Sequence, residues 1–502
     1  MENYVFFIGG TGARVLRSFL HLCASGAVRL DSKINVVMLD VDSENYACTE
    51  AKELYDIYRE TRGKLNDRKV QDVLKGAVVP AFYPQVEMPS AGAAVISPIT
   101  NANATLDLAA SGSKRALEWF YTEEERNQSL KHGFFAHPNI GCLFFDSVRD
   151  ALLPHINNIA GTLNSDRDVR VAIVGSMFGG TGAAGIPTVL RILHDECQNL
   201  VSSDDKMKRL HFGGVLVTPY FKFKDPSGAT GNLHIHHNVF FGNTRSALEY
   251  YDWNYKEKFE RIYLAGQDIL QFVSPNGEYV DGGNKQRNKP HIVELIGAMG
   301  VRNFLMDASD FRGSMNIYEM ILKSEGRENE PIFGWNTLDA ELSAIGDMLR
   351  TQTLMRMVIA PCVLGLVSDK WPWFKTFNMK TMDNQAELKA WLLYTDRFLD
   401  WIYNIQYQLR EPNGDGYARD ERISLAGYPI EAVYENGRMD IAKDFAALIQ
   451  NDTSAVNVTY KYADGKKLLG QLGAMGILHS KYSKLGTPGL FIQLFNLASE
   501  KT

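Results

Sequence analysis

The chain has 502 residues, of which 45% are apolar and 22% charged, and 53 basic against 59 acidic residues give it a net charge of −6. This length corresponds to roughly two to four domains, and the composition is that of a soluble globular protein. A mildly acidic chain lacks the basic face that sequence-independent nucleic-acid binding requires, which argues against nucleic acid as a partner.

The cysteines and the hydropathy of the chain indicate the cellular compartment in which it is expected. The five cysteines lie far apart and form no CxxC pair, which favours a reducing compartment and argues against a disulfide framework or a zinc ribbon. The longest apolar run, residues 357–367, is too short to span a bilayer and contains Pro361. Acidic Glu2 and the lack of a basic flank argue against a secretory signal. We therefore expect a cytoplasmic protein without a membrane span.

The first predicted elements form a βαβ unit. Residues 4–8 (YVFFI) are an apolar run that ends at the string GGTG, residues 9–12, and a helical stripe follows. A second buried strand over residues 34–39 (INVVML) is closed by Asp40 and Asp42. Continuous apolar strands of this kind indicate a parallel sheet that is covered on both faces.

Further along the chain the same arrangement returns. Residues 45–130 are more polar and are predicted to be largely helical. A third strand over residues 169–174 then leads into a second GGTG string at 179–182, and a helix is predicted from about Pro187, because proline suits the first helical turn. Additional predicted elements are strands at 210–218 and 261–265 and a buried helix that begins near residue 292.

Beyond about residue 311 the pattern changes. Long amphipathic stretches at 339–366 and 384–408 predict a mainly helical second half. A polar loop is expected at 411–416, and the aromatic residues at 391–407 recur at a helical spacing that is typical of a core or an interface. We therefore predict an α/β domain over residues 1–310, with an insertion at about 45–130, and a mainly helical domain over 311–502.

The two GGTG strings are the main chemical signal. Glycine lets backbone amides approach an anion closely, and the N-terminus of a helix adds partial positive charge. In an open α/β sheet both loops would lie at the carboxyl edge, where ligands bind. The sequence thus predicts a phosphate site, while tight packing between strand and helix is the alternative use of these glycines.

Neither string fits the commonest nucleotide motifs. A Walker loop requires Lys-Ser or Lys-Thr after its last glycine, and neither string is followed by that pair. A GxGxxG turn would need a third glycine where Val15 stands. Asp40 and Asp42 follow the first string at about the distance of a ribose-binding acid. A nicotinamide or flavin oxidoreductase therefore stays open as an alternative.

Four segments together resemble a known family. In chain order they are GGTGARV at 9–15, GFFAHPNIG at 133–141, GGTGAAGIP at 179–187 and VLVTPYFKF at 215–223. They are similar, in the same order, to the N-terminal nucleotide loop, the γ-phosphate loop GAGANPEIG, the stretch GGTGTGAAP and the strand and loop VVTKPFxF of the tubulin/FtsZ superfamily of GTP-binding cytoskeletal proteins. The bacterial FtsZ branch is more similar than eukaryotic tubulin.

The resemblance has clear departures. It covers patches between residue 1 and about residue 310, and Phe178 stands where the family has a third glycine. After Gly182, Ala183 and Ala184 stand where the family has a residue with a hydroxyl group and a glycine. The second half of the chain does not resemble the family's second domain.

The resemblance implies a site for GTP or GDP with Mg²⁺. The resemblance implies that backbone groups of the two strings contact the phosphates: Gly9, Gly10, Thr11, Gly12, Gly179, Gly180, Thr181 and Gly182. It places Ala136 and His137 at the γ-phosphate. Asp42 would lie near water-bound magnesium, and Asp40 would either share that role or cap the following helix. Asp225 or Lys224 would meet the ribose.

Guanine would be recognised by a side-chain amide, which offers a donor and an acceptor together. Asn288 is the first choice and Asn284 the second, and an N-cap for the helix after Pro290 is the alternative role for either.

A pair of acidic residues follows that helix. Asp307 and Asp310 have the D-x-x-D spacing of the family loop NxDxxD, although Leu305 replaces the asparagine. The resemblance implies that this loop enters the nucleotide site of the next subunit and helps to polarise the attacking water. A helix cap is the alternative role for Asp310.

The leading prediction is therefore a GTP-binding and GTP-hydrolysing protein that assembles with copies of itself, head to tail, into filaments. The alternative is a nucleotide-dependent switch or scaffold that does not polymerise and binds a partner protein through its C-terminal half.

Overall fold

In a computed structural model of the chain, the described residues are 1–65, 82–89, 101, 118–127, 129–130, 133–134, 138–145, 148–224, 239–255, 257–268, 270–273, 277, 280, 282–309, 311, 315–323, 333–334, 393–394, 397–398, 400–401, 404–405, 408–413, 416–420 and 423–424.

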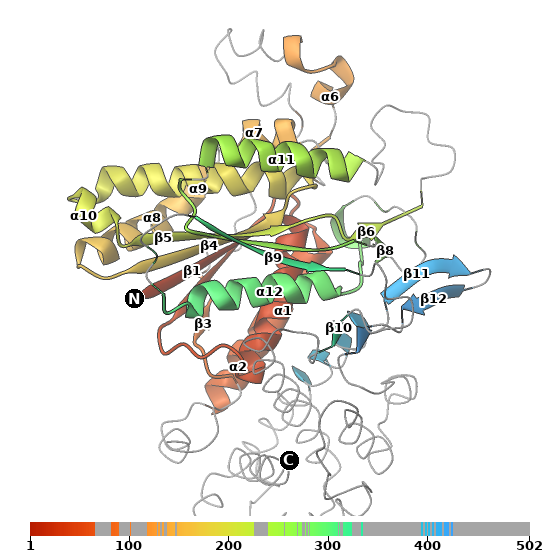
Figure 1. Cartoon of the computed structure of the whole chain (residues 1–502), viewed down its shortest axis with the longest axis horizontal. Coiled ribbons are helices and arrows are strands. Elements are labelled where there is room, and N and C mark those ends of the chain that lie inside the picture. Colours follow the sequence, from red (N-terminus) through yellow and green to blue (C-terminus); the bar gives the residue numbers. More distant parts are fainter. Residues whose placement is uncertain are drawn as a thin grey trace, which may run out of the picture.

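The centre of the described structure is a sheet of seven parallel strands in the order β3-β2-β1-β4-β5-β7-β9 (Figure 1). Its strands are β1 (Glu2–Ile8), β2 (Ile34–Leu39), β3 (Val86–Glu87), β4 (Val169–Ser176), β5 (Leu210–Val217), β7 (Arg261–Gln267) and β9 (Asn316–Leu322). The central strands are continuous apolar runs that are buried along almost their whole length. The predicted α/β fold with a parallel sheet is thus confirmed.

The strand order reverses between β1 and β4. Strand β1 pairs with β2 on one side and with β4 on the other. Because all strands run in the same direction, the loops that follow β1 and β4 leave the same edge of the sheet side by side. In open α/β sheets a ligand crevice forms where the strand order reverses in this way.

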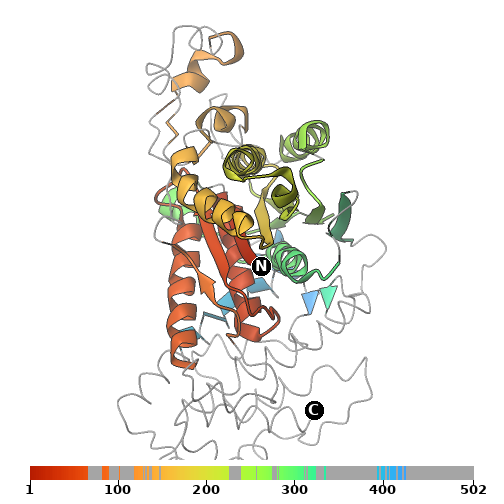
Figure 2. The same ribbon diagram turned by 90° about the vertical axis from the view of Figure 1, so that its left-hand side faces the viewer.

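Helices cover both faces of the sheet (Figure 2). On one face lie α1 (Gly9–Ser25), α2 (Tyr46–Leu65) and α12 (Ile292–Met306). On the other face lie α8 (Arg149–Asn164), α9 (Gly180–Leu200) and α11 (Val239–Tyr255). The remaining described helices are α6 (Glu123–Asn127), α7 (Pro138–Phe145), α10 (Asp204–Met207) and the 3-10 turn η3 (Gly283–Lys285).

Short strands form a second, smaller sheet with the order β12-β11-β8-β6. Strand β6 (Phe221–Lys222) is parallel to β8 (Gln271–Phe272), while β11 (Gln408–Asn413) pairs antiparallel with both β8 and β12 (Gly416–Asp420). A separate pair joins β10 (Phe333–Gly334) to β13 (Ile423–Ser424). The second half of the chain thus reaches β8, which belongs to the first half.

A helical stretch from the second half packs on α1. The residues described between 393 and 405 are helical, as their amphipathic pattern predicts. Four of their side chains are buried in the same core cluster as α1, namely Tyr394, Phe398, Trp401 and Ile405, whereas Leu393 is exposed. The indole Nε1 of Trp401 donates to Ser18 Oγ at 3.1 Å, and the Tyr394 hydroxyl lies 2.7 Å from His21 Nδ1. Three of the aromatic residues predicted as core or interface, Tyr394, Phe398 and Trp401, are therefore core, and Trp391, Tyr403 and Tyr407 lie outside the described residues.

Two local predictions were wrong. The helix expected from about Pro187 begins at Gly180, so Pro187 lies inside α9. Proline cannot donate to the carbonyl four residues earlier, which is that of Ala183. The Tyr251 hydroxyl donates to this carbonyl instead, at 2.9 Å, and so satisfies the group that Pro187 leaves without a helical partner.

The second error concerns the polar loop at 411–416. Strand β11 extends to Asn413, and Asn413 pairs with Gly416 of β12. Asn-Gly and Asp-Gly dipeptides between strands are a signal for a tight hairpin, and the sequence NGDG at 413–416 contains both.

The domain division at about residue 310 stays a prediction. Strand β9 lies beyond this position and still pairs with β7 in the main sheet. Most of residues 311–502, and much of the predicted insertion at 45–130, lie outside the described residues. Among the helices that the structure describes, none has the length and apolar character that crossing a bilayer demands.

Candidate functional site

A pocket opens where the strand order of the main sheet reverses. Its walls come from the two glycine strings, which we call the first glycine loop (residues 9–12) and the second glycine loop (residues 179–182), from the end of β2, and from β6. The lining includes Gly9, Gly10, Thr11, Arg14, Asp40, Asp42, Asn45, Gly133, Phe134, Ser176, Phe178, Gly179, Gly180, Thr181, Gly182, Phe221, Lys222, Phe223, Phe240, Val273, Val280, Gly282, Gln286 and Asn288.

The two glycine loops touch each other at the bottom of this pocket. Gly9 has a φ of +70°, a conformation that favours glycine, and a Cβ placed on it would lie 3.3 Å from Thr181 Cβ. A Cβ on Gly182 would lie 2.5 Å from the Ser176 carbonyl oxygen. The loops therefore need glycine both for backbone conformation and for close packing.

Both loops are at the same time the first turns of helices. Helix α1 begins at Gly9, directly after β1, and α9 begins at Gly180, with three residues between it and the end of β4 at Ser176. Neither helix has an acidic residue in its first turn or a side chain that caps its N-terminus. The first backbone amides of a helix have no partner within the helix, so two such N-termini beside one pocket form an environment that favours an anion.

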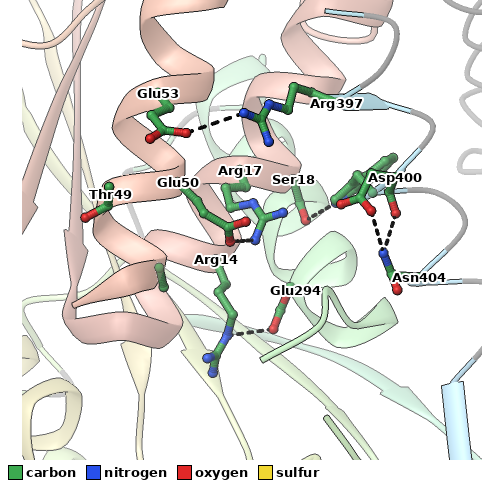
Figure 3. A network of polar contacts seen from close by, with 12 residues as sticks. Arg14, Arg17, Ser18, Thr49, Glu50, Glu53, Glu294, Arg397, Asp400 and Asn404 are labelled. Atoms are coloured by element: carbon green, nitrogen blue, oxygen red, sulfur yellow. Dashed lines mark hydrogen bonds and ion pairs between the residues drawn. The ribbon is translucent and has the colours of Figure 1, made fainter. Parts of the chain in front are cut away.

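Arg14 connects the first glycine loop to α12. Its Nε lies 2.8 Å from Glu294 Oε1 (Figure 3). Its Nη2 donates to the Tyr220 hydroxyl at 2.9 Å and to Thr11 Oγ1 at 3.4 Å. The Tyr220 hydroxyl in turn donates to Glu294 Oε1 at 2.8 Å. The side chains of Arg14 and Glu294 are 6% and 2% exposed, so the pair is buried in the wall of the pocket.

His291 extends this network at the start of α12. Its Nδ1 accepts from the Val293 amide at 3.2 Å, so the proton is on Nε2, which donates to Gln271 Oε1 at 2.7 Å. Burial, with Arg14 nearby, holds the pKa of His291 well below its usual value. The imidazole is therefore neutral and serves as the N-cap of α12, paired with Glu294 in a capping box.

Sequence reasoning missed this network. Arg14 and Glu294 are far apart in the chain, and only the packing of α1 against α12 brings them together. The capping box His291-x-x-Glu294 lacks the usual Ser or Thr. The one available signal was Arg14, which is separated from the first GGTG string by a single alanine.

Two carboxylates stand at the end of β2. Asp42 Oδ2 accepts from the Gly283 amide at 2.6 Å and Asp42 Oδ1 from the Glu44 amide at 3.0 Å. Asp40 Oδ2 accepts from Asn45 Nδ2 at 2.8 Å, and burial raises the pKa of Asp40 to about 6. Asp42 thus ties the end of β2 to the segment that leads to Asn288.

These two carboxylates fit Mg²⁺ only as partial ligands. Magnesium usually keeps several waters and is held by one or two carboxylates together with phosphates. In the described part of the chain, no group of three or more His, Cys, Asp and Glu side chains could hold a metal ion. A carboxylate accepts about four bonds through its two oxygens, so the chemistry of Asp42 is compatible with a metal that also binds phosphate oxygens.

The pocket also has an aromatic wall and amide side chains. Phe221 and Phe223 come from β6 and the residue after it, and Phe240 packs against both with ring centroids 5.6 and 6.0 Å apart. Lys222 lies in the same wall with its Nζ 5.0 Å from the centre of the Phe272 ring. Asn288 and Gln286 also line the pocket, whereas Asn284 does not.

Asp307 lies at the other edge of the sheet. It follows the last residue of α12, and its carboxylate contacts Arg261, the first residue of β7. The glycine loops lie at the opposite edge of the sheet, because they follow the carboxyl ends of the parallel strands β1 and β4. Helix α12 spans roughly 22 Å at 1.5 Å per residue and begins beside the pocket, so Asp307 is separated from the pocket by its length.

The structure thus brings together most of the predicted site residues. Gly9, Gly10, Thr11, Gly179, Gly180, Thr181, Gly182, Asp42 and Asn288 line one pocket. Gly12 lies below it, where a Cβ would be 2.8 Å from the Phe7 carbonyl carbon. Four predicted residues lie outside the described residues: Ala136, His137, Asp225 and Asp310.

Comparison with known proteins adds matches among solved structures. No family model matches the chain, and no curated protein matches it. Nineteen chains of solved structures match, among them "CetZ2 from Haloferax volcanii - GTPgS bound protofilament", with 13% sequence identity and a TM-score of 0.27. The match covers 61% of this chain and 61% of that chain. With a TM-score this low, the match carries no argument about the fold, the site or the function.

Proposed function

We propose that the protein binds GTP in the pocket between the glycine loops and hydrolyses it in head-to-tail assemblies with copies of itself. The observation that supports binding most directly is the pair of helix N-termini, free of side-chain caps, that face one pocket. A triphosphate is the ligand that matches two adjacent anion sites.

The aromatic and amide side chains of the pocket support a nucleotide over inorganic phosphate. Phe221, Phe223 and Phe240 offer apolar ring surface to a planar base, and the Asn288 amide offers a donor and an acceptor. The preference for guanine rests on the resemblance to the tubulin/FtsZ superfamily. Asp42, with the phosphates, is our choice for holding Mg²⁺, whose role would be to neutralise phosphate charge.

The position of Asp307 supports hydrolysis between subunits. With α12 between it and the pocket, Asp307 cannot reach a nucleotide in its own subunit. A second copy stacked on the first would bring its pocket to this edge, and such a head-to-tail contact continues into an open filament. Asp310, outside the described residues, is proposed as the second acidic residue of this edge.

Binding is tested by calorimetry of the purified chain with GTP, GDP, ATP and NAD, each with Mg²⁺ and with a chelator. We expect GTP and GDP to bind, and Asn288→Ala to reduce the preference for GTP over ATP. Asn284→Ala is the matched control, since it removes the same amide four residues away and outside the pocket. A preference for NAD would instead support the oxidoreductase alternative, and no binding of any nucleotide would overturn the proposal.

Hydrolysis is tested by the GTP turnover of each subunit at increasing protein concentration, with electron microscopy of the same samples. A filament GTPase turns over faster per subunit above a critical concentration. Asp307→Asn should keep GTP affinity and lose turnover, whereas Asp252→Asn on the outer surface of α11 should change neither. Equal turnover in wild type and Asp307→Asn would refute the assigned role.

A second candidate function, a nucleotide-dependent switch that does not polymerise, is favoured by a separate observation. The second half of the chain contacts two elements that continue from the walls of the pocket. Strand β11 pairs with β8, which neighbours β6 in the pocket wall, and Tyr394, Phe398, Trp401 and Ile405 pack in the same core cluster as α1, whose first turn is the first glycine loop. A ligand in the pocket could therefore stabilise the second half for binding a partner protein.

Amide hydrogen exchange separates the two candidates. If the protein is a switch, GTP should slow exchange at residues 393–413 in a chain that stays monomeric in sedimentation at every concentration. Exchange that changes only when the chain assembles would favour the filament instead.

A further inference from the structure

Arg261 and Asp307 form an ion pair at the edge of the main sheet that lies away from the pocket. The Nε of Arg261 donates to Asp307 Oδ2 at 3.2 Å, and its Nη2 donates to Ser309 Oγ at 3.0 Å. The Ser309 amide donates to Asp307 Oδ1 at 2.8 Å. Each carboxylate oxygen of Asp307 thus has a partner within its own chain.

The guanidinium of Arg261 is itself fixed. Its third nitrogen, Nη1, donates to the Glu260 carbonyl at 2.9 Å, and its Cζ lies 4.8 Å from the centre of the Phe311 ring. The side chain is only 5% exposed, whereas that of Asp307 is 19% exposed. A planar, fully engaged guanidinium holds a carboxylate in one direction, and part of that carboxylate still reaches the surface.

These contacts also set the ionisation of Asp307. Burial acts to raise the pKa of Asp307, but the hydrogen bonds from Ser309 and Arg261 outweigh it, so the pKa lies below its usual value. A carboxylate of this kind is a weak base, yet it remains a hydrogen-bond acceptor of fixed direction. Positioning and electrostatics are what phosphoryl transfer requires of a protein.

We propose that Arg261 is a positioning residue for GTP hydrolysis, because it fixes the Asp307 carboxylate so that it accepts a hydrogen bond from the attacking water in the next subunit. This inference rests on the proposed function. The water oxygen forms a bond to the γ-phosphorus, and the bond from that phosphorus to the bridging oxygen breaks, with its electron pair leaving on GDP. One water proton stays on the released phosphate and the other passes to solvent.

Arg170 provides an internal comparison. It is a second guanidinium of the same cluster, 4.6 Å from the Phe311 ring, and it donates to the backbone carbonyls of Phe304, Leu305 and Asp307. It therefore caps the C-terminus of α12 but has no hydrogen bond to the Asp307 carboxylate. The other titratable groups packed around this cluster are Asp168, His211, Glu260 and Tyr263.

The test compares Arg261→Gln, Arg261→Lys and Arg170→Gln in the full chain. GTP affinity, kcat and KM are measured from pH 5 to 8 at a protein concentration where wild-type turnover per subunit is saturated. We expect Arg261→Gln to lower kcat about tenfold or more with little change in KM, since a charge-assisted hydrogen bond is lost. The acidic limb of its profile of kcat against pH should move to higher pH, because the pKa of Asp307 rises when Arg261 is removed.

The other variants provide the contrast. Arg261→Lys should restore the acidic limb, because it keeps the charge, while kcat recovers only in part, because the second donor is gone. Arg170→Gln should lower the unfolding temperature but keep the wild-type pH profile. An Arg261→Gln profile that coincides with that of Arg170→Gln would overturn the inference. If Arg261→Gln does not fold, wild-type kcat in Arg261→Lys would overturn it.

Asp307→Asn separates this failure from failure of the proposed function. If Asp307→Asn abolishes turnover while the Arg261 variants behave like wild type, the proposed function stands and only the role of Arg261 falls. If Asp307→Asn keeps wild-type turnover, the proposal that hydrolysis is completed at this edge is refuted, and so is the role of Arg261.

Discussion

The side chains of Arg14 and Glu294 form an ion pair with 2.8 Å between Nε and Oε1, and it joins the first glycine loop to the first turn of α12. Both side chains are almost completely buried. Together with the Tyr220 hydroxyl, this ion pair links residues that line the pocket to the helix that leads to the opposite edge of the sheet.

Removing one partner of this pair should be costly. Arg14→Met leaves the Glu294 carboxylate buried without the Arg14 cation, and we expect the free energy of unfolding to fall by about 3–5 kcal/mol. The double variant Arg14→Met/Glu294→Gln should lose less than the two single variants together, because it buries no unpaired charge. Urea denaturation of the four proteins measures this coupling, and strictly additive losses would contradict it.

Asp42 should affect nucleotide binding with or without magnesium. Its contact with the Gly283 amide fixes the segment before Asn288, so Asp42→Ala should weaken GTP binding about tenfold, the effect of about 1.4 kcal/mol. Titrations with Mg²⁺ and with a chelator measure both cases. A loss confined to the magnesium titration would assign Asp42 to the metal alone.

The second glycine loop should not tolerate a methyl group. A Cβ at Gly182 would lie 2.5 Å from the backbone oxygen of Ser176, which cannot move aside easily. We expect Gly182→Ala to reduce stability by about 1–3 kcal/mol.

Gly161→Ala is the matched control for Gly182→Ala. Gly161 lies on the exposed side of α8 with no atom within 4 Å of the added Cβ. It should raise stability by up to about 1 kcal/mol through helix propensity. Thermal unfolding compares the two variants, and equal shifts would contradict the steric argument.

His291 should make the fold sensitive to acid. Its pKa lies well below 6.5 in the folded state because it is buried, so the unfolded chain takes up this proton first as the pH falls. The associated stability is fully present above about pH 6.5 and is lost below it, by up to about 1.4 kcal/mol per pH unit.

His291→Asn tests this pH dependence. Asparagine also caps helices but does not titrate, so the variant should lose stability less steeply between pH 6.5 and 5. His21, which is also buried with a lowered pKa, remains in the variant and accounts for a second proton. Identical slopes in wild type and His291→Asn would show that His291 does not contribute.

The sheet and the glycine loops could be predicted because their signals are local. Continuous apolar runs such as residues 34–39 define parallel strands, and GGTG strings mark the turns between strand and helix. The error at Pro187 shows the limit of such rules, since the hydroxyl of Tyr251, 64 positions away, supplies the partner that lets a proline lie inside the helix.

The partners of the site residues could not be predicted. Nothing near Asp307 in the sequence indicates Arg261 or Arg170, because the starts of β4 and β7 meet the end of α12 only in the folded sheet. Arg14 is similar, as its acidic partner depends on how two helices pack. Sequence patterns therefore located the pocket, whereas the charges that tune it come from tertiary structure.

The pairing of Phe272 with Leu409 has a consequence for how the protein is made. During translation, β8 leaves the ribosome long before β11, which follows it by more than 130 positions. The small sheet beside the pocket cannot be completed until most of the chain has been synthesised. A ribosome-bound fragment that ends near residue 310 should therefore contain every residue that lines the pocket but lack β11 and β12 of the small sheet.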